Sequence, residues 1–355
     1  MKQSFLRVLL AGSLFGIAIG LIIFLFQMLP IEGTSLGIDW RGIWLDIQGG
    51  IPRYSRGLRN PPWSLFPVLP LGFLSFKSGW ALLVLATLAV EVISVPRKKS
   101  KRIDLPVTFF LITSYHSIRN IADGNLEFLT IAGVLLMLYA YPKQNPWFLA
   151  SGFLLASAKP QETWLLLAIL CLFVLRTWRL DQMLPAAIGV FIIVSIFMLW
   201  VGSEWINALS GIEARGSIMD ISLLATFSRL RWPSIVVWAI WIAILGITLY
   251  IAYSTGYGLD RCKAALLISA SLLLSPYAAG NSLLAINAIG VVAFFRSQPK
   301  FALALAILTN LPYLHAAYPG FWYSYGAYYT TFVLFVAWCI FAWKNRENAE
   351  SVGTV

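Results

Sequence analysis

The chain has 355 residues, of which 59% are hydrophobic and only 12% charged, and its mean hydropathy is +0.78. Because soluble domains carry about 25% charged residues, this composition excludes a water-soluble globular protein and indicates a polytopic membrane protein. The net charge of +11 has three possible explanations: binding to nucleic acid, binding to anionic lipid, or an excess of lysines and arginines on one side of a bilayer.

Apolar runs predict a nearly continuous series of membrane-spanning helices, since a crossing needs about 20 apolar residues. The first run, Phe5 to Met28, is too long for a signal peptide and no small-residue cleavage site follows it, so we expect an uncleaved helix. Later runs predict helices over 79–95, 105–121, 125–141, 147–160, 162–176, 184–201, 232–253, 263–275, 281–295, 301–317 and 326–343. The shorter run 63–76 contains Pro67 and Pro70, and we expect a membrane-embedded half-helix there.

The distribution of basic residues predicts the orientation of these helices. The positive-inside rule places the run RKKSKR, 97–102, in the cytoplasm. If 63–76 does not cross, twelve spans result, both termini are cytoplasmic, and the short basic loops all share the inner side. We therefore expect a single transmembrane domain, 1–355, in the plasma membrane, with a first outer loop at 30–62, a second at 202–231 and a cytoplasmic tail at 344–355. The positive charge then reflects topology, and no nucleic-acid partner is expected.

The first outer loop carries two acids, Asp39 and Asp46, among four arginines. Asp39 is either an ordinary solvated loop residue or a general base at the water boundary of a membrane cavity, where partial loss of water makes a carboxylate more basic. Asp46 follows seven residues later and would share a helical face with Asp39. A partnership with a nearby arginine is the simpler interpretation of Asp46.

Lys159 is the most informative charge at a membrane edge, because charges near lipid are costly and commonly functional. It directly precedes the helix-breaking Pro160 and lies three residues before Glu162. Its ammonium could bind a phosphate, or it could pair with Glu162 or extend toward water. In the turn before the 125–141 helix, Asp123 and Asn125 flank Gly124 and are expected to cap helices.

Other chemistry is sparse. The aromatic last outer loop with His315 suggests an interfacial belt, or else a stacking surface for a sugar or a slot for an isoprenoid tail. The two histidines lack metal-ligand spacing and the three cysteines are scattered, so we expect no metal or cofactor, although a divalent ion is not excluded. Because no nucleotide-binding motif is present, substrate and energy should come from within the membrane.

Taken in order, several of these residues resemble glycosyltransferase family 87, the polyprenyl-phosphate-mannose-dependent mannosyltransferases of the GT-C class. The resemblance extends from about residue 35 to 295. The matching elements are the first-loop aspartate, the pattern Gly50-x-Pro52-x-Tyr54, Pro61-Pro62, the turn Gly124-Asn125 where the family has Gly-Gln, the helix end Lys159-Pro160, and Ser275-Pro276-Tyr277.

The resemblance implies a GT-C-like all-α bundle that moves a hexose, by analogy mannose, from a polyprenyl-phosphate donor to an acceptor hydroxyl of a lipid or glycan on the outer face. Asp39 maps onto the catalytic base. Lys159, Arg215 and Arg229 are the expected ligands of the donor phosphate. The other expected substrate-binding residues are Arg41, Asp46, Tyr54, Asn125, Gln161, Tyr277 and His315.

Two other classes of protein share the expected topology. A transporter or flippase of a lipid-linked or small polar substrate would have similar spans and basic inner loops, but would not need a polar first loop of about thirty residues. A non-catalytic membrane scaffold is disfavoured only by the charges on the outer face.

Overall fold

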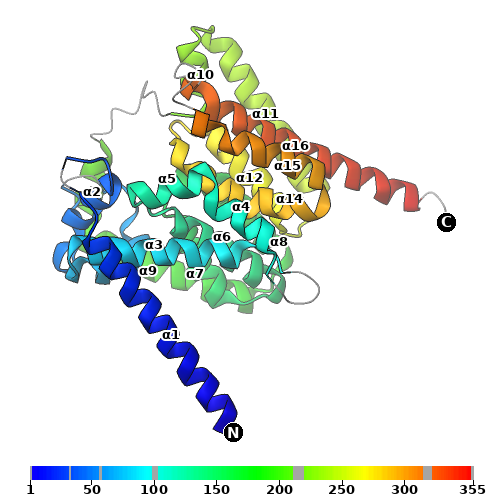
Figure 1. Ribbon diagram of the computed structural model, residues 1–355. Helices are drawn as coiled ribbons and strands as arrows, with labels where there is room; N and C mark the ends of the chain where they lie inside the picture. Colours follow the sequence, from blue (N-terminus) through cyan, green and yellow to red (C-terminus); the bar gives the residue numbers. More distant parts are fainter. Residues whose placement is uncertain are drawn as a thin grey trace.

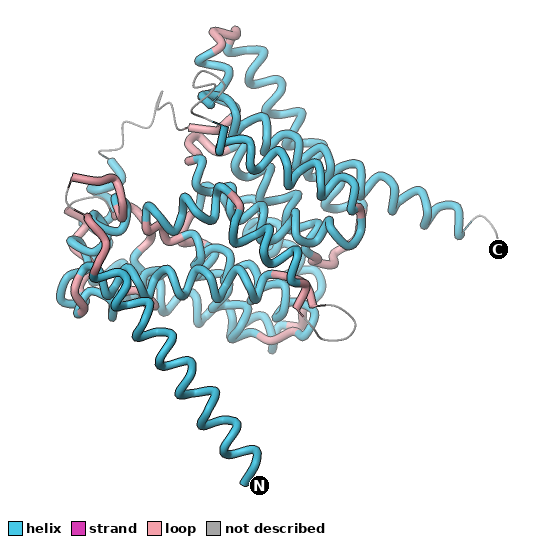
Figure 2. Tube along the Cα trace, viewed as in Figure 1, coloured by secondary structure: helices cyan, strands magenta, loops and turns pink. Residues whose placement is uncertain are grey.

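The computed structural model describes residues 2–31, 33–55, 58–97, 103–210, 220–314 and 322–352. Their regular structure is helical apart from one isolated β-bridge, Asp220 to Ala279, and the loops are short connections (Figure 2). Helices occupy most of the predicted spans: α1 (Lys2–Gln27), α3 (Phe76–Ser94), α6 (Glu127–Lys143), α7 (Pro146–Ala156), α8 (Pro160–Thr177), α9 (Leu180–Ser210), α11 (Ser234–Ser254), α12 (Arg261–Leu274), α15 (Pro299–Asn310) and α16 (Trp322–Val352).

Within the described residues, four helices are long and apolar enough to cross a bilayer: Phe76–Ser94, Pro160–Thr177, Leu180–Leu209 and Ser234–Ser254. Shorter apolar helices occur at Gly16–Gln27, Pro146–Ala156, Gly280–Arg296 and Tyr325–Phe341. The chain is therefore an all-helical membrane protein, and the number of twelve crossings stays a prediction.

Three predicted helices are broken. The run 105–121 divides into α4 (Leu105–Thr113) and α5 (Tyr115–Asp123), because the Ser114 hydroxyl accepts a hydrogen bond from the N–H of Ser117 and starts a new helix. The run 281–295 consists of η4 (Gly280–Ser282), α13 (Leu283–Ile286), the π-helical turn η5 (Asn287–Val291) and α14 (Val292–Ser297). Most of the run 301–317 is α15, followed by the 3-10 turn η6 (Leu311–Leu314).

The predicted half-helix at 63–76 is corrected to two 3-10 turns, η2 (Pro62–Leu65) and η3 (Leu69–Phe73). Pro67 and Pro70 lack an N–H and disfavour a helical residue before them, so a continuous α-helix cannot form. Two short helices of the outer loops were not predicted: α2 (Ile38–Ile47) and α10 (Leu223–Arg229).

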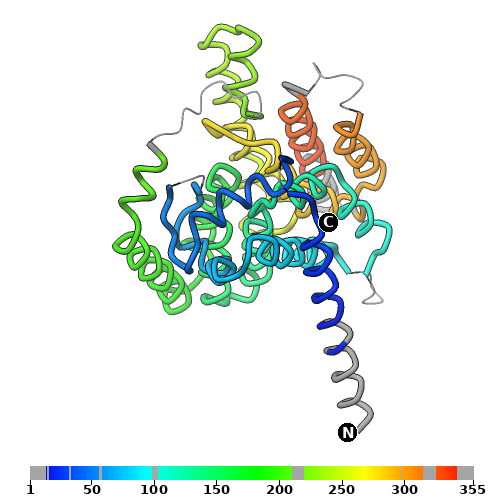
Figure 3. The backbone as a smooth tube through the Cα atoms, turned by 60° about the vertical axis from the view of Figure 1, so that its left-hand side comes forward, coloured from blue at the N-terminus to red at the C-terminus, as the bar shows by residue number. Residues whose placement is uncertain are grey.

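Helix α12 forms the centre of the bundle, and residues 262–274 are all buried. It packs against α8, α11 and α16, whereas α1 packs on α3 and otherwise points away from the bundle (Figures 1 and 3). Helices α6 and α7 approach to backbone contact, since a Cβ on Gly133 would lie 2.2 Å from the nitrogen of Ala156. A Cβ on Gly152 would likewise lie 2.8 Å from the carbonyl oxygen of Gly133.

Loops predicted to share a side of the membrane lie at the same end of the bundle. Arg261 donates a hydrogen bond to the carbonyl of Ser94, and Arg296 Nη2 donates to that of Pro96 at 2.7 Å. These contacts join loops assigned to the inner side; residues 98–102 of the basic run lie outside the described residues. The opposite end gathers α2, α5, η4 and the starts of α6 and α8, where the site residues lie.

Candidate active site

The position of Asp39 is fixed by close packing of α2 on the end of α5. Gly37 begins α2 with φ 65° and donates its N–H to the carbonyl of Ala122 at 2.7 Å. Gly124 ends α5 with φ 72°, and a Cβ there would lie 2.4 Å from the Cβ of Trp40. Asp123, which was expected to cap a helix, is the last residue of α5, and the cap is Gly124, whose left-handed turn brings the start of α2 against residues 123–125.

Asp39 is half-buried and makes a defined contact across the bundle. Its Oδ2 accepts a hydrogen bond from Nδ2 of Asn125 at 2.8 Å. Asn125 was expected to cap a helix, but α6 begins with Leu126 as its N-cap and no side-chain hydrogen bond there, so that expectation is wrong. Asp123 lies nearby: burial raises its pKa, Arg119 at 2.6 Å opposes this, and the charge of Asp39 adds to the rise.

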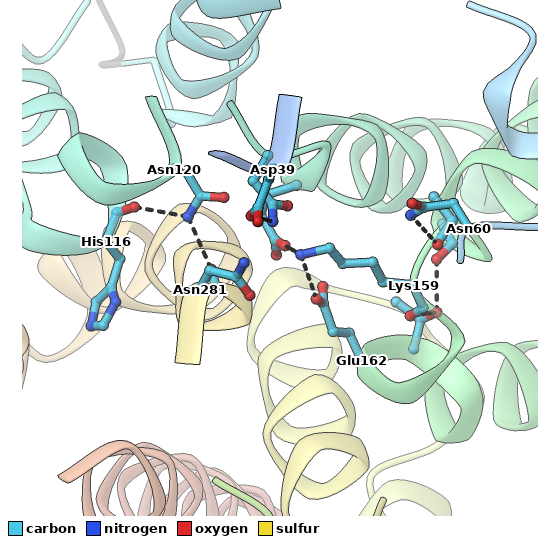
Figure 4. Close-up of polar contacts among 12 residues, drawn as sticks. Asp39, Asn60, His116, Asn120, Lys159, Glu162 and Asn281 are labelled. Atoms are coloured by element: carbon cyan, nitrogen blue, oxygen red, sulfur yellow. Dashed lines mark hydrogen bonds and ion pairs between the residues drawn. The ribbon is translucent and has the colours of Figure 1, made fainter. Parts of the chain in front are cut away.

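Lys159 lies in the turn between α7 and α8, where it meets two buried glutamates (Figure 4). Its Nζ is 2.5 Å from Oε2 of Glu127 and 3.3 Å from Oε1 of Glu162, and both glutamates are 0% exposed. Burial alone would lower the pKa of Lys159, but these two carboxylates raise it above its ordinary value. The expected pairing with Glu162 is present, and the shorter contact is with Glu127.

Two peripheral segments close around this group. Asn60 of the first loop donates to the carbonyl of Ala158 at 2.8 Å, which ties that loop to the Lys159 turn. Asp220 is buried, and its Oδ1 accepts from the N–H groups of Ser222 at 2.9 Å and Ala278 at 3.1 Å. This anchors the described end of the second outer loop on the turn that carries Tyr277.

Tyr277 shares the electrostatic environment of the site. Burial raises the pKa of its hydroxyl, the charges of Asp220 and Asp39 add to the rise, and Lys159 lowers it. Arg229 of α10 donates from Nη2 to the carbonyl of Asp220 at 2.7 Å and to Thr226 Oγ1 at 3.3 Å. Its guanidinium therefore lies beside the Asp220 anchor.

Asp46 and Tyr54 have structural partners within their own loop. The carboxylate of Asp46 is 0% exposed and accepts from Ser55 N at 2.8 Å, Ser55 Oγ at 2.8 Å and Leu58 N at 3.0 Å. Tyr54 is buried, and its hydroxyl donates to the carbonyl of Asn60 at 2.9 Å. We therefore assign both side chains to the fold of the first loop rather than to substrate contact.

The remaining predicted residues are dispersed. Arg41 is exposed, donates to the carbonyl of Ile31 at 3.3 Å and lies over the ring of Phe76. Gln161 is half-buried in the first turn of α8. Arg215 and His315 lie outside the described residues, within which no cluster of three or more potential metal ligands occurs.

Four residues of the site were not among the predicted catalytic or binding residues: Asn120, Glu127, Asp220 and Asn281. Glu162 was predicted only as a partner of Lys159. Asn120 is 1% exposed, and its Nδ2 donates to the carbonyls of His116 at 2.8 Å and Asn281 at 3.0 Å (Figure 4). The available signal was a polar residue at the end of an apolar run, and it is shared with ordinary helix caps and turns.

Comparison with protein families gives one result. The model of glycosyltransferase family 87 matches residues 59–276, well over half of the chain. The match includes Asn125, Lys159, Gln161 and Arg229, whereas Asp39 precedes it and Tyr277 follows it directly. Comparison with curated proteins and with solved structures yields no significant match. The chain belongs to glycosyltransferase family 87 and is a membrane glycosyltransferase.

Proposed function

We propose that the protein transfers a hexose, in the first instance mannose, from a polyprenyl-phosphate donor to an acceptor hydroxyl of a lipid or glycan. The reaction takes place at the end of the bundle opposite the basic loops, which by the positive-inside rule is the outer face, and both termini are cytoplasmic. The observation that carries this proposal is the half-buried carboxylate of Asp39 beside the Lys159 turn.

Asp39 acts as the general base. Asn125 donates to Oδ2 and orients the carboxylate, which leaves Oδ1 to take the proton from the acceptor hydroxyl. As that oxygen attacks the anomeric carbon from the face opposite the phosphate, the bond from this carbon to the phosphate oxygen breaks and the configuration inverts. The transition state resembles an oxocarbenium ion, so negative charge grows on the departing phosphate.

Cationic side chains stabilise that charge where water is scarce. The ammonium of Lys159 has three N–H donors. One bonds Glu127, and Glu162 is an ion-pair partner at 3.3 Å without a hydrogen bond, so donors remain for the phosphate. Because the two carboxylates offset much of the lysine charge, an arginine is also needed. Our candidates are Arg229, at the end of α10, and Arg215, in the second outer loop.

The test is a transfer assay on the purified protein. With radiolabelled polyprenyl-phosphate mannose we expect acceptor-dependent release of polyprenyl phosphate, and Asp39→Asn should lower the rate about 10²- to 10⁴-fold at an unchanged thermal unfolding midpoint. Asp181→Asn is the matched control, because this exposed acid pairs with Arg179 at the other end of the bundle. Near-full activity of Asp39→Asn would exclude the assigned base. Movement of label across vesicles without release would instead favour a flippase.

A further inference from the structure

Three asparagines at the site end carry side-chain oxygens that have no hydrogen-bond partner among the described residues: Asn120, Asn125 and Asn281. Asn120 is 1% and Asn125 9% exposed, while Asn281 is half-buried. A buried acceptor without a donor destabilises the protein, so three of them at one end of the bundle require an explanation.

The chemistry of the partners fixes which end of two of these amides is the oxygen. Nδ2 of Asn125 faces the Asp39 carboxylate, and Nδ2 of Asn120 faces two backbone carbonyls. All three partners only accept hydrogen bonds, so a flipped amide would oppose oxygen to oxygen. In both residues the side-chain NH2 group therefore donates to the protein, and the side-chain oxygen is left as an acceptor without a described partner.

These oxygens belong to the same site as Asp39 and Lys159. In Figure 4 the side-chain ends of Asn120 and Asn281 point toward Asp39 and the Lys159–Glu162 pair. Contacts agree with this view: Asn120 donates to the backbone carbonyl of Asn281, and α13, which follows η4, packs against α6, the helix that carries Glu127. Three chain segments, the α5–α6 region, the α7–α8 turn and η4, thus face one another.

The polar groups gathered there are mostly acceptors. The acceptors are the three amide oxygens and the carboxylates of Asp39, Glu127 and Glu162; the donors are the ammonium of Lys159 and the amide N–H groups of Asn281. A phosphate also consists of acceptors and cannot satisfy an amide oxygen. A pyranose can, because each of its hydroxyls donates a hydrogen bond.

We propose that Asn120, Asn125 and Asn281 accept hydrogen bonds from hydroxyls of the transferred hexose and so determine which sugar the enzyme takes. The inference rests on the proposed function and adds a specificity role for Asn120 and Asn281. Sites built to bond a hydroxyl discriminate strongly against substrates that lack it in the right place, because a buried acceptor is then left unpaired.

The test compares donors that differ in one hydroxyl configuration. The rates of transfer from polyprenyl-phosphate mannose, glucose and galactose are measured for the wild type and for Asn281→Ala and Asn120→Ala. For each variant we expect about a tenfold loss of kcat/KM with the preferred sugar, a smaller loss with the others, and hence reduced discrimination.

Asn310→Ala is the matched control, because that amide is satisfied at both ends by Ala306 O at 2.9 Å and Tyr115 N at 3.0 Å. It should lower the unfolding midpoint without changing the ratio of rates among donors. Should Asn120→Ala fail to fold, Asn281→Ala carries the test, since its side chain is half-buried and bonds no described residue.

The outcomes separate this inference from the proposed function. An active wild type whose donor ratios are unchanged in Asn281→Ala would overturn the specificity role alone. A wild type that releases polyprenyl phosphate from none of the three donors would overturn the proposed function and this inference with it.

Discussion

Replacing Asp46 by alanine should loosen the first outer loop without touching the chemistry. Among the hydrogen bonds made by described residues, the change removes the acceptor of those from Ser55 N, Ser55 Oγ and Leu58 N, at a site that is 0% exposed. Hydrogen bonds to a charged group contribute about 2 kcal/mol each. Part of the roughly 6 kcal/mol total is recovered when the loop opens and its donors reach water, so we expect a net loss of about 3–4 kcal/mol.

The expected loss converts to a measurable shift of the unfolding midpoint. With an unfolding entropy of about 2.1 cal/mol/K per residue, 355 residues give about 0.7 kcal/mol per degree, and the midpoint should fall by roughly 5 °C. The assay is thermal unfolding in detergent, with Asp39→Asn as the companion variant at a wild-type midpoint. If Asp46→Ala were inactive at a wild-type midpoint, Asp46 and not Asp39 would belong to the chemistry, and our assignment would be refuted.

Three further outcomes follow from the site. Lys159→Gln should lower the free energy of unfolding by about 3–5 kcal/mol, because it leaves buried carboxylates without their cation. Adding Glu127→Gln to this variant should restore much of the unfolding midpoint but not the transfer activity. Equal midpoints for Lys159→Gln and the wild type would contradict this. Gly124→Ala should destabilise the protein by at least about 1 kcal/mol and lower the rate of sugar transfer, since the φ of Gly124 is 72° and the new Cβ would meet Trp40. If the variant kept the wild-type rate and unfolding midpoint, α2 would be free to shift. Burial raises the pKa of Asp123 in the folded state, so ionisation of this carboxyl opposes folding. The stability of the protein should therefore fall as the pH rises above about 4, the pKa of an aspartate in the unfolded chain. Asp123→Asn should weaken this pH dependence when the unfolding midpoint is measured against pH.

Helix positions could be predicted because membrane-spanning helices are defined by apolar length, a local property of the chain. The breaks could not, because they depend on single groups. Ser114 interrupts an apolar run by capping a new helix, and α2 forms in a polar loop where apolar length gives no signal. The prolines of 63–76 predicted a membrane-embedded half-helix, whereas the segment forms two 3-10 turns.

The site was predictable only where partners are close in sequence. The spacing of Lys159 and Glu162 by three residues indicated an ion pair, whereas Glu127 is 32 residues away and its contact follows from the packing of α6 on α7. Asn125 and Asp39 are 86 residues apart. No helical or strand periodicity encodes such a contact, so the mutual placement of base and amide required the tertiary structure.

The backbone contact between Gly133 and Gly152 has a consequence for the bilayer in which the enzyme works. Helix α6 carries Glu127 in its first turn, and α7 leads into the Lys159 turn, so the crossing of the two helices sets the spacing of that pair. A helix can tilt when the thickness of the bilayer changes, and its packing against neighbouring helices limits that tilt. Helices α6 and α7 meet through backbone atoms at Gly133 and Gly152, and this contact cannot adjust through side-chain rotamers. The ion pair of Lys159 and Glu127 should therefore keep its geometry as the thickness of the surrounding lipid changes.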